Sequence, residues 1–243
     1  MTNDVSSRAT EAARQLSVLI PYLPIPSLVD LAMIGNAECH AALALAQKVD
    51  TPVSAALTEM ADLPELMLLI GNKGAKIASF SLIRMVERFN GQEALISAVE
   101  ARAPLSEDVW AALASARLRT VLALIGDRSD PLAIDEAIIA LLWASDPSTR
   151  AAYLTSFERF NRLTPQMVPI ALGSGATHVA AAILAVLVSV PHSDVEAILS
   201  RRDKPLLARW IAMAGLSESL VAEFIAAVDR STIKPSEFSR LAA

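Results

Sequence analysis

The residues that could bind a metal ion or act as a nucleophile are few. The chain has three histidines and one cysteine in 243 residues. Cys39 and His40 are adjacent, so on a helix their side chains would point about 100° apart, which disfavours joint action on a ligand. His192 and Glu196 have the i, i+4 spacing of a two-ligand site, but zinc needs three or four protein ligands. We therefore expect neither a metal centre nor a Cys–His nucleophile.

A second candidate is the turn at residues 71–76, which reads Gly-Asn-Lys-Gly-Ala-Lys. Backbone amides at the start of a helix could cradle a phosphate there. The Walker pattern needs four residues between its glycines and a Ser or Thr after its lysine, and this turn has neither. The turn is more typical of a helix C-terminus, with Lys73 and Lys76 in solvent.

Carboxylates gather around one expected inter-helix turn, at Asp127, Asp130, Asp135 and Glu136. Such a group could perform general acid–base chemistry or bind a divalent cation. Asp130 precedes a proline, however, and acidic residues near a helix start are favoured by the helix dipole. We interpret them as caps, and the sequence predicts no catalytic residue and no cofactor.

Basic residues near expected helix ends form a fourth candidate. In stacked helix pairs equivalent turns line up, so these side chains could form a track for phosphates. HEAT-like DNA glycosylases use such a basic concave face with a tryptophan and a carboxylate, and Trp143 with Asp146 offers that pair. The net charge of −5 and the 5% of aromatic residues argue against a nucleic-acid binder. The candidate binding residues are Lys73, Lys76, Arg117, Arg119, Trp143, Asp146, His178, Arg201 and Arg202.

Helix signals divide almost the whole chain. Proline in the first turn after Ser, Thr or Asp marks helix starts, and Gly or Asn marks helix ends. Apolar residues recur every three to four positions between these signals, and the alternating runs typical of strands are absent. Residues 193–196 also have the pattern of a capping box. The expected helices are 5–19, 26–34, 37–47, 52–60, 64–70, 76–89, 92–102, 106–115, 117–125, 131–144, 147–160, 165–172, 177–189, 193–201, 204–214 and 217–229, with a short last turn after Pro235.

The chain also repeats itself. Residues 64–78 and 165–180 each contain a short proline-started helix, a glycine turn and the start of a long apolar helix. Repeated helix pairs cannot bury their apolar faces alone, so they stack. We predict an all-α fold of stacked antiparallel helix pairs, a HEAT-like α-solenoid of irregular 24–32-residue repeats, with an irregular multi-helix bundle as the alternative. One domain is expected over residues 1–243, with residues 1–50 as an N-terminal cap and 51–230 as helical repeats.

Three segments carry a family resemblance: Asp50-Thr51-Pro52-Val53, Asp62-Leu63-Pro64 and the stretch from Arg102 to Val109. They resemble an uncharacterised bacterial family of HEAT-like helical-repeat proteins, mainly from alphaproteobacteria, over about residues 40–230. The matching motifs are helix caps and hydrophobic staples. The resemblance implies a helical-repeat fold in the cytosol and transfers no catalytic residue.

The composition indicates a large core, because 53% of the residues are hydrophobic and only 19% are charged. The most apolar segment, Val179 to Val190, is shorter than the roughly 20 residues that cross a bilayer. A single cysteine fits a reducing compartment. We therefore expect a cytoplasmic protein without a membrane span.

These observations favour a non-enzymatic protein–protein interaction or scaffold module, since stacked helix pairs commonly bind a peptide or another domain. We expect a groove flanked by the turns at Lys73–Lys76, Arg117–Arg119 and Gly173–His178, a protein partner, and self-association as a further option. The alternative is a HEAT-like DNA-binding or DNA-glycosylase-type enzyme with a basic concave face. A small-molecule or lipid pocket in the apolar interior is the third hypothesis.

Overall fold

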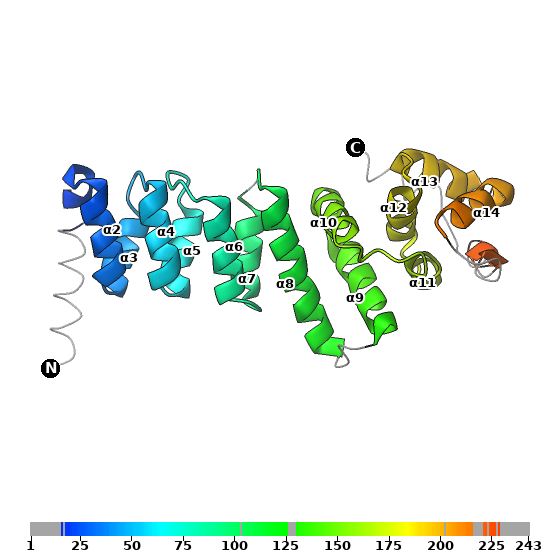
Figure 1. Ribbon diagram of the computed structural model, residues 1–243, viewed down its shortest axis with the longest axis horizontal. Helices are drawn as coiled ribbons and strands as arrows, with labels where there is room; N and C mark the ends of the chain where they lie inside the picture. The colour runs from blue at the N-terminus through cyan, green and yellow to red at the C-terminus, as the bar shows by residue number, and fades with distance from the viewer. Residues whose placement is uncertain are drawn as a thin grey trace. The chain divides into compact units, whose positions relative to one another are not determined.

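The computed structural model describes residues 16, 18–102, 104–125, 130–201, 203–215, 221–222, 224–226 and 228. The chain divides into two compact units, Met1–Ala116 (unit 1) and Arg117–Ala243 (unit 2), and each is considered by itself. Apart from one isolated backbone bridge, every regular element in the described residues is helical (Figure 1). The predicted all-α class and the packing of neighbouring helices in pairs are confirmed.

Unit 1 is a stack of helix pairs in two rows. Helices α2, α4 and α6 pack side by side in one row, α3, α5 and α7 form the other, and each pair is α2 with α3, α4 with α5 or α6 with α7 (Figure 1). Its elements are the 3-10 helix η1 (Ile20–Tyr22), α2 (Ile25–Ile34), α3 (Ala37–Ala44), α4 (Thr51–Met60), α5 (Leu63–Gly71), α6 (Ser79–Arg88), α7 (Glu93–Glu100) and the first part of α8 (Glu107–Ile125). The first-row helices and α8 begin at residues 25, 51, 79 and 107, so the repeat is 26 to 28 residues long.

The pairs of unit 1 are joined by side chains that close helix ends. The last carbonyls of a helix have no partner within the helix. Asn72 at the end of α5 donates to the carbonyls of Ala44, the last residue of α3, and of Ala46, both at 2.7 Å. Arg88 at the end of α6 donates to the carbonyls of Thr58 and Ala61 at the end of α4.

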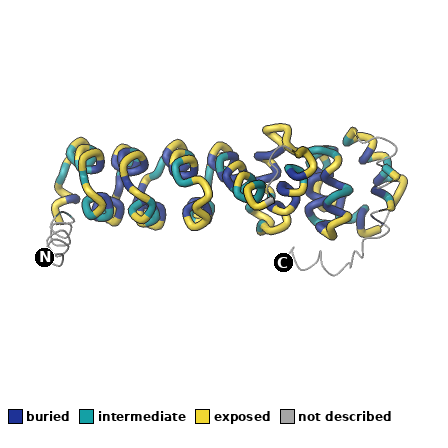
Figure 2. The backbone as a smooth tube through the Cα atoms, turned by 90° about the horizontal axis from the view of Figure 1, so that it is seen from below, coloured by how far each residue is buried: buried dark blue, intermediate teal, exposed yellow. Residues whose placement is uncertain are grey.

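Arg102, which follows α7, continues the pattern by donating to the carbonyls of Ile70, Asn72 and Ala75 at 2.8, 3.0 and 2.6 Å. We call Asn72, Arg88 and Arg102 the capping ladder. The side chain of each member donates to carbonyls at the end of an earlier helix in the same row: α3 for Asn72, α4 for Arg88 and α5 for Arg102. Each member therefore fixes one helix pair against the next. Along each helix of unit 1 the backbone tube changes between buried and exposed, as expected for amphipathic helices (Figure 2).

Unit 2 is built around one buried helix. Its described helices are α9 (Pro131–Ala144), α10 (Pro147–Arg159), α11 (Met167–Gly173), α12 (Thr177–Val188), α13 (His192–Arg201) and α14 (Lys204–Met213). The sequence of α12, THVAAAILAVLV, is apolar on all sides, and α9, α10, α11, α13 and α14 all pack against it. A helix of this composition is stable when other helices surround it. Unit 2 is therefore arranged around a central helix, whereas the helices of unit 1 form two rows.

Several expected boundaries are wrong. The two helices expected at 106–115 and 117–125 are one helix, α8, because Ala116 and Arg117 are good helix formers and no Gly or Pro interrupts them. Helix α6 begins at Ser79 instead of residue 76, because the backbone amide of Lys76 donates a hydrogen bond to the carbonyl of Val49, just before α4. The helices expected at 5–19 and 217–229 and the turn after Pro235 lie largely or wholly outside the described residues.

Proline-associated caps are confirmed at three helix starts, whereas α4 and α5 begin without a side-chain cap hydrogen bond. Asp130, Asp146 and Asp203 accept backbone hydrogen bonds at the starts of α9, α10 and α14. The capping box at residues 193–196 is wrong, because α13 already begins at His192 and Ser193 lies inside it. None of the described helices combines the length and apolar character needed to cross a bilayer.

Candidate functional site

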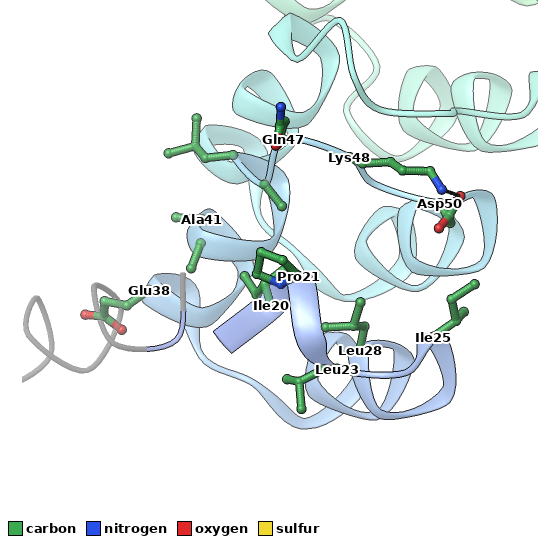
Figure 3. Close-up of a pocket in the computed structure, with 13 residues that line it drawn as sticks. Ile20, Pro21, Leu23, Ile25, Leu28, Glu38, Ala41, Gln47, Lys48 and Asp50 are labelled. Carbon is green, nitrogen blue, oxygen red and sulfur yellow. Dashed lines mark ion pairs between the residues drawn. The ribbon is translucent and has the colours of Figure 1, made fainter. Parts of the chain in front are cut away.

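An apolar groove of about 720 Å³ opens at the first helix pair of unit 1 (Figure 3). Segment η1 and helix α2 line one side with Leu23, Ile25 and Leu28, while α3 lines the other with Ala41 and the residue after its end, Leu45. Leu45 lines the groove, and 62% of its surface is exposed to solvent. The groove therefore presents apolar side chains to solvent from two different elements.

Helix α2 explains why this groove is open. Its sequence, IPSLVDLAMI, contains a single charged residue, yet Ala32 is its one buried residue. Helix α4 occupies the next position in the same row and buries five residues, because α2 covers one of its sides and α6 another. In the described part of the chain, α2 and α3 follow only η1 and residues 16, 18 and 19. Helix α2 thus exposes a surface that α4 buries, whereas α3 of the same first pair buries four residues.

The exposed apolar surface extends beyond the groove. Tyr22 of η1 is 84% exposed, and Leu19 immediately before η1 is also exposed. We define the end face as the groove-lining residues Leu23, Ile25, Leu28 and Leu45 together with Leu19 and Tyr22 beside them. Clusters of exposed apolar side chains on soluble proteins commonly mark binding surfaces.

The rim of the groove carries charges of both signs. Glu38 lies at one end, while Lys48 and Asp50 lie at the other (Figure 3). The Asp50 carboxylate lies 3.6 Å from the Lys48 ammonium and 3.8 Å from the Lys76 ammonium. The rim therefore gives no strong preference for an acidic or a basic partner.

Three backbone amides of the turn at residues 71–76 donate hydrogen bonds within the protein. The amide of Gly74 donates to Asn72 Oδ1 at 2.8 Å, that of Ala75 to the Asn72 carbonyl at 3.1 Å, and that of Lys76 to the Val49 carbonyl at 2.8 Å. An anion at this turn would find these three donors occupied. Gly74 is required for a close approach, because a Cβ there would lie 2.1 Å from the Gln47 carbonyl oxygen. Lys73 and Lys76 are exposed, as the helix-end interpretation predicts.

In unit 2 the structure brings two predicted residues, Asp146 and His178, into one neighbourhood around Arg150 of α10. The Arg150 guanidinium donates to the carbonyls of Leu142 and Ser145, both at 2.7 Å, which closes the end of α9. Arg150 also interacts electrostatically with Asp146 and with His178 at the start of α12. Trp143, in the last turn of α9, is half exposed.

The electrostatics of this neighbourhood suit a structural role. Hydrogen bonds from Ser148 and Thr149 hold the pKa of the Asp146 carboxyl well below its usual range, so it is a poor proton acceptor near neutral pH. Burial, assisted by the charges of Arg150 and His192, lowers the pKa of His178. The carboxylate is a helix cap and the imidazole is neutral at pH 7.

The remaining predicted residues lie on several elements. Arg117 and Arg119 lie on α8, Arg201 is exposed at the end of α13, and Arg202 lies outside the described residues. Lys73 and Lys76 belong to unit 1 and the other candidates to unit 2. The groove expected between these turns stays a prediction.

Histidine and cysteine side chains have other partners. His40 is buried, and its Nε2 lies 2.9 Å from the Ala32 carbonyl oxygen, so it ties α3 to α2. His192 Nδ1 lies 3.7 Å from Glu196 Oε1. Burial raises the pKa of the Cys39 thiol, which makes it less nucleophilic. Among the described residues, no three His, Cys, Asp or Glu side chains are grouped to hold a metal ion.

One acidic residue has a role that sequence reasoning missed. Asp135, interpreted as a dipole partner, lies in the second turn of α9 and accepts a hydrogen bond of 2.7 Å from Thr164 Oγ1. Burial raises the pKa of its carboxyl. The end face and the capping ladder were also missed. A signal for the end face was present in the apolar sequence of α2, the first helix of the stack.

The comparisons with known proteins agree with the helical-repeat resemblance. A family model described as "Uncharacterised protein conserved in bacteria (DUF2336)" matches residues 21–241. No curated protein and no solved structure matches the chain. The match covers both units almost completely, and the chain belongs to this uncharacterised bacterial family.

Proposed function

We propose that the protein is a non-enzymatic protein–protein interaction module that binds its partner through the end face of unit 1. The observation that carries the proposal is the contrast within one row of helices: α2 is as apolar as a core helix but buries one residue, whereas α4 buries five. A terminal helix pair normally needs a polar outer face to stay soluble alone. A partner that covers the end face would supply the missing burial.

The shape of the end face favours a helical partner. The groove lies between α2 and α3, and its lining is mainly aliphatic. The backbone groups of the lining helices are engaged in helical hydrogen bonds, so the surface offers no strand edge to an extended peptide. An amphipathic helix with one apolar stripe is the element that fits such a groove.

The alternative of a basic nucleic-acid surface has weaker support. Lys76 lies beside Asp50, Arg150 is bound to helix-end carbonyls, and Asp146 serves as a helix cap. A phosphate contact by Lys76 or Arg150 would have to compete with these existing interactions.

The test is affinity purification of the tagged full chain from its native cytosol, with and without nuclease, followed by mass spectrometry. Leu45→Asp places a charge on the end face at an exposed position, and Met213→Asp is its matched control, because Met213 is also 62% exposed but lies on α14 of unit 2. We expect a co-purifying protein that resists nuclease, is lost from Leu45→Asp and is kept by Met213→Asp. Equal recovery by both variants, or loss of the partner on nuclease treatment, would contradict the proposal.

A further inference from the structure

We infer that residues 5–16, which we call the N-terminal segment, fold back as an amphipathic helix on α3 and occupy the end face until a partner displaces them. This inference rests on the proposed function and adds an internal competitor for the same site. The segment belongs to unit 1 and comes shortly before η1, which lines the groove.

The spacing of apolar residues gives the N-terminal segment one apolar side. Val5, Ala9, Ala12 and Leu16 follow one another at intervals of four, three and four residues, which places them in one stripe along a helix. All three charged residues of the segment lie off this stripe. An amphipathic helix with one apolar stripe is the element that fits the groove.

The described residues at the end of this pattern agree with it. Residues 16, 18 and 19 are helical. Leu16, on the stripe, is partly buried, whereas Val18 is 64% exposed. Two positions along a helix correspond to a rotation of about 200°, so Val18 lies on the side opposite the stripe.

The repeat of unit 1 places the N-terminal segment on α3. The second-row helices α3, α5 and α7 begin at residues 37, 63 and 93, so their starts are 26 and 30 residues apart. One further repeat before Ala37 begins between residues 7 and 11, inside the segment. Since α3 packs on α5 and α5 packs on α7, the segment has the position of the second-row helix that packs on α3.

Helix α3 and the residue after it offer a matching stripe. Glu38, Ala41, Ala42 and Leu45 line the groove and follow one another at helical spacing (Figure 3). Ala41 is only partly buried and Leu45 is exposed, so this side has room for another helix. The alanines in both stripes allow the two helix axes to approach closely.

The connections fix the level at which the two helices meet. Because α3 packs on α2 after a two-residue turn, the end of α3 lies beside η1, and Ile20 and Leu45 line the same groove. A helix that enters η1 from the second row runs parallel to α3. Leu19 is then level with Leu45 and, seven residues earlier in each helix, Ala12 is level with Glu38.

A disulfide tests this position in the full chain. In a Cys39→Ala background, Ala12→Cys with Glu38→Cys should form an intramolecular disulfide in most molecules under oxidised glutathione, as read by mass spectrometry. Thr10→Cys with Glu38→Cys is the matched control, because Thr10 lies on the opposite side of the segment, and it should stay largely reduced. Similar oxidation of both pairs, or a disulfide that forms only between two chains, would overturn the inference.

The competition is tested with a fluorescently labelled peptide of residues 2–16 as the probe. A segment that occupies its own site in about 90% of molecules lowers the apparent affinity for a competitor about tenfold. Ala9→Asp, on the stripe, should therefore bind the peptide about tenfold more tightly than the wild type in fluorescence anisotropy. Thr10→Asp should bind like the wild type, and Leu45→Asp added to Ala9→Asp should abolish binding. Equal affinity of Ala9→Asp and the wild type, or tight binding that survives Leu45→Asp, would overturn the inference.

This inference and the proposed function fail separately. If the disulfide forms with the expected preference but the affinity purification recovers no partner, the N-terminal segment covers the end face and the proposed function fails. If Leu45→Asp loses a partner but the Ala12–Glu38 pair shows no preference over its control, the proposed function stands and the inference fails.

Discussion

Units 1 and 2 contain similar helices but bury them differently. In unit 1 each helix is covered by the neighbours on either side of it in the stack, so the amount of burial depends on position and is lowest at α2. In unit 2, α12 lies at the centre, and eight of its 12 residues are buried. The comparison teaches that an apolar helix marks a core only when the fold supplies neighbours on all sides. At the end of a stack the same kind of sequence leaves apolar side chains exposed, and this is the surface that we propose for binding.

The largest difference in the free energy of unfolding is expected between a fully buried side chain of α12 and an exposed side chain of α2. Leu184 of α12 is fully buried, so Leu184→Ala should lower the free energy of unfolding by about 2–5 kcal/mol through lost burial and a cavity. Ile34 of α2 is exposed, and Ile34→Ala should change it by less than about 0.5 kcal/mol. Urea unfolding monitored by circular dichroism measures both. A similar change in the free energy of unfolding for the two variants would contradict the difference in burial between α12 and α2.

The capping ladder is the next feature to test. Arg102→Leu should cost about 1–3 kcal/mol, because three helix-end carbonyls of unit 1 lose their donor. The matched control is Arg84→Leu, since Arg84 forms only surface ion pairs with Glu59 and Glu87 and little change is expected. The midpoint of urea unfolding gives the comparison. An Arg102 variant as stable as the Arg84 variant would show that the ladder does not hold the pairs together.

The turn between α5 and α6 offers a matched pair of glycines. Gly74→Ala should destabilise unit 1 by about 1–3 kcal/mol, because its Cβ would meet the Gln47 carbonyl oxygen and force the two turns apart. Gly71→Ala meets nothing within 4 Å at the end of α5 and should stabilise slightly, by up to about 1 kcal/mol. Thermal unfolding followed by circular dichroism should rank Gly71→Ala above the wild type and Gly74→Ala below it.

The smallest effect concerns pH and unit 2. The pKa of His178 in the folded protein is below its ordinary value of 6.5, so folding favours the neutral imidazole. Its contribution to stability is present above about pH 6.5 and is lost as the pH falls through the lowered pKa. His178→Gln should therefore reduce the loss of melting temperature below pH 6.5. A variant with the same pH dependence as the wild type would contradict this account of the neighbourhood around Arg150.

Much of the fold could be predicted because its signals are local. Asp130, Asp146 and Asp203 precede helices with proline in the first turn, and their caps depend on residues within three positions. The run at residues 177–188 is apolar on every side, which already indicated a long apolar helix. The one large error, the division of α8, arose where no glycine or proline marks a boundary.

The sites were harder to predict because they depend on contacts between distant residues. Asn72, Arg88 and Arg102 are ordinary helix-end residues in the sequence, and their acceptors lie 26 to 32 positions away. The neighbourhood of Asp146 and His178 exists only because α10 packs on α12. The sequence of α2 shows that the helix is apolar, but its exposure depends on how little of the described chain packs on it, so the end face could not be placed from the sequence alone.

The most direct test of the central claim is hydrogen–deuterium exchange of the full chain without and with the partner recovered by affinity purification, read from peptides that cover α2 and α12. The account predicts that the partner slows the exchange of the α2 amides in the wild type and that Leu45→Asp removes this protection. The amides of α12 should be equally protected in both proteins with and without the partner. Exchange of the wild-type α2 amides that the partner does not slow would show that it does not cover the end face, and it would contradict the account.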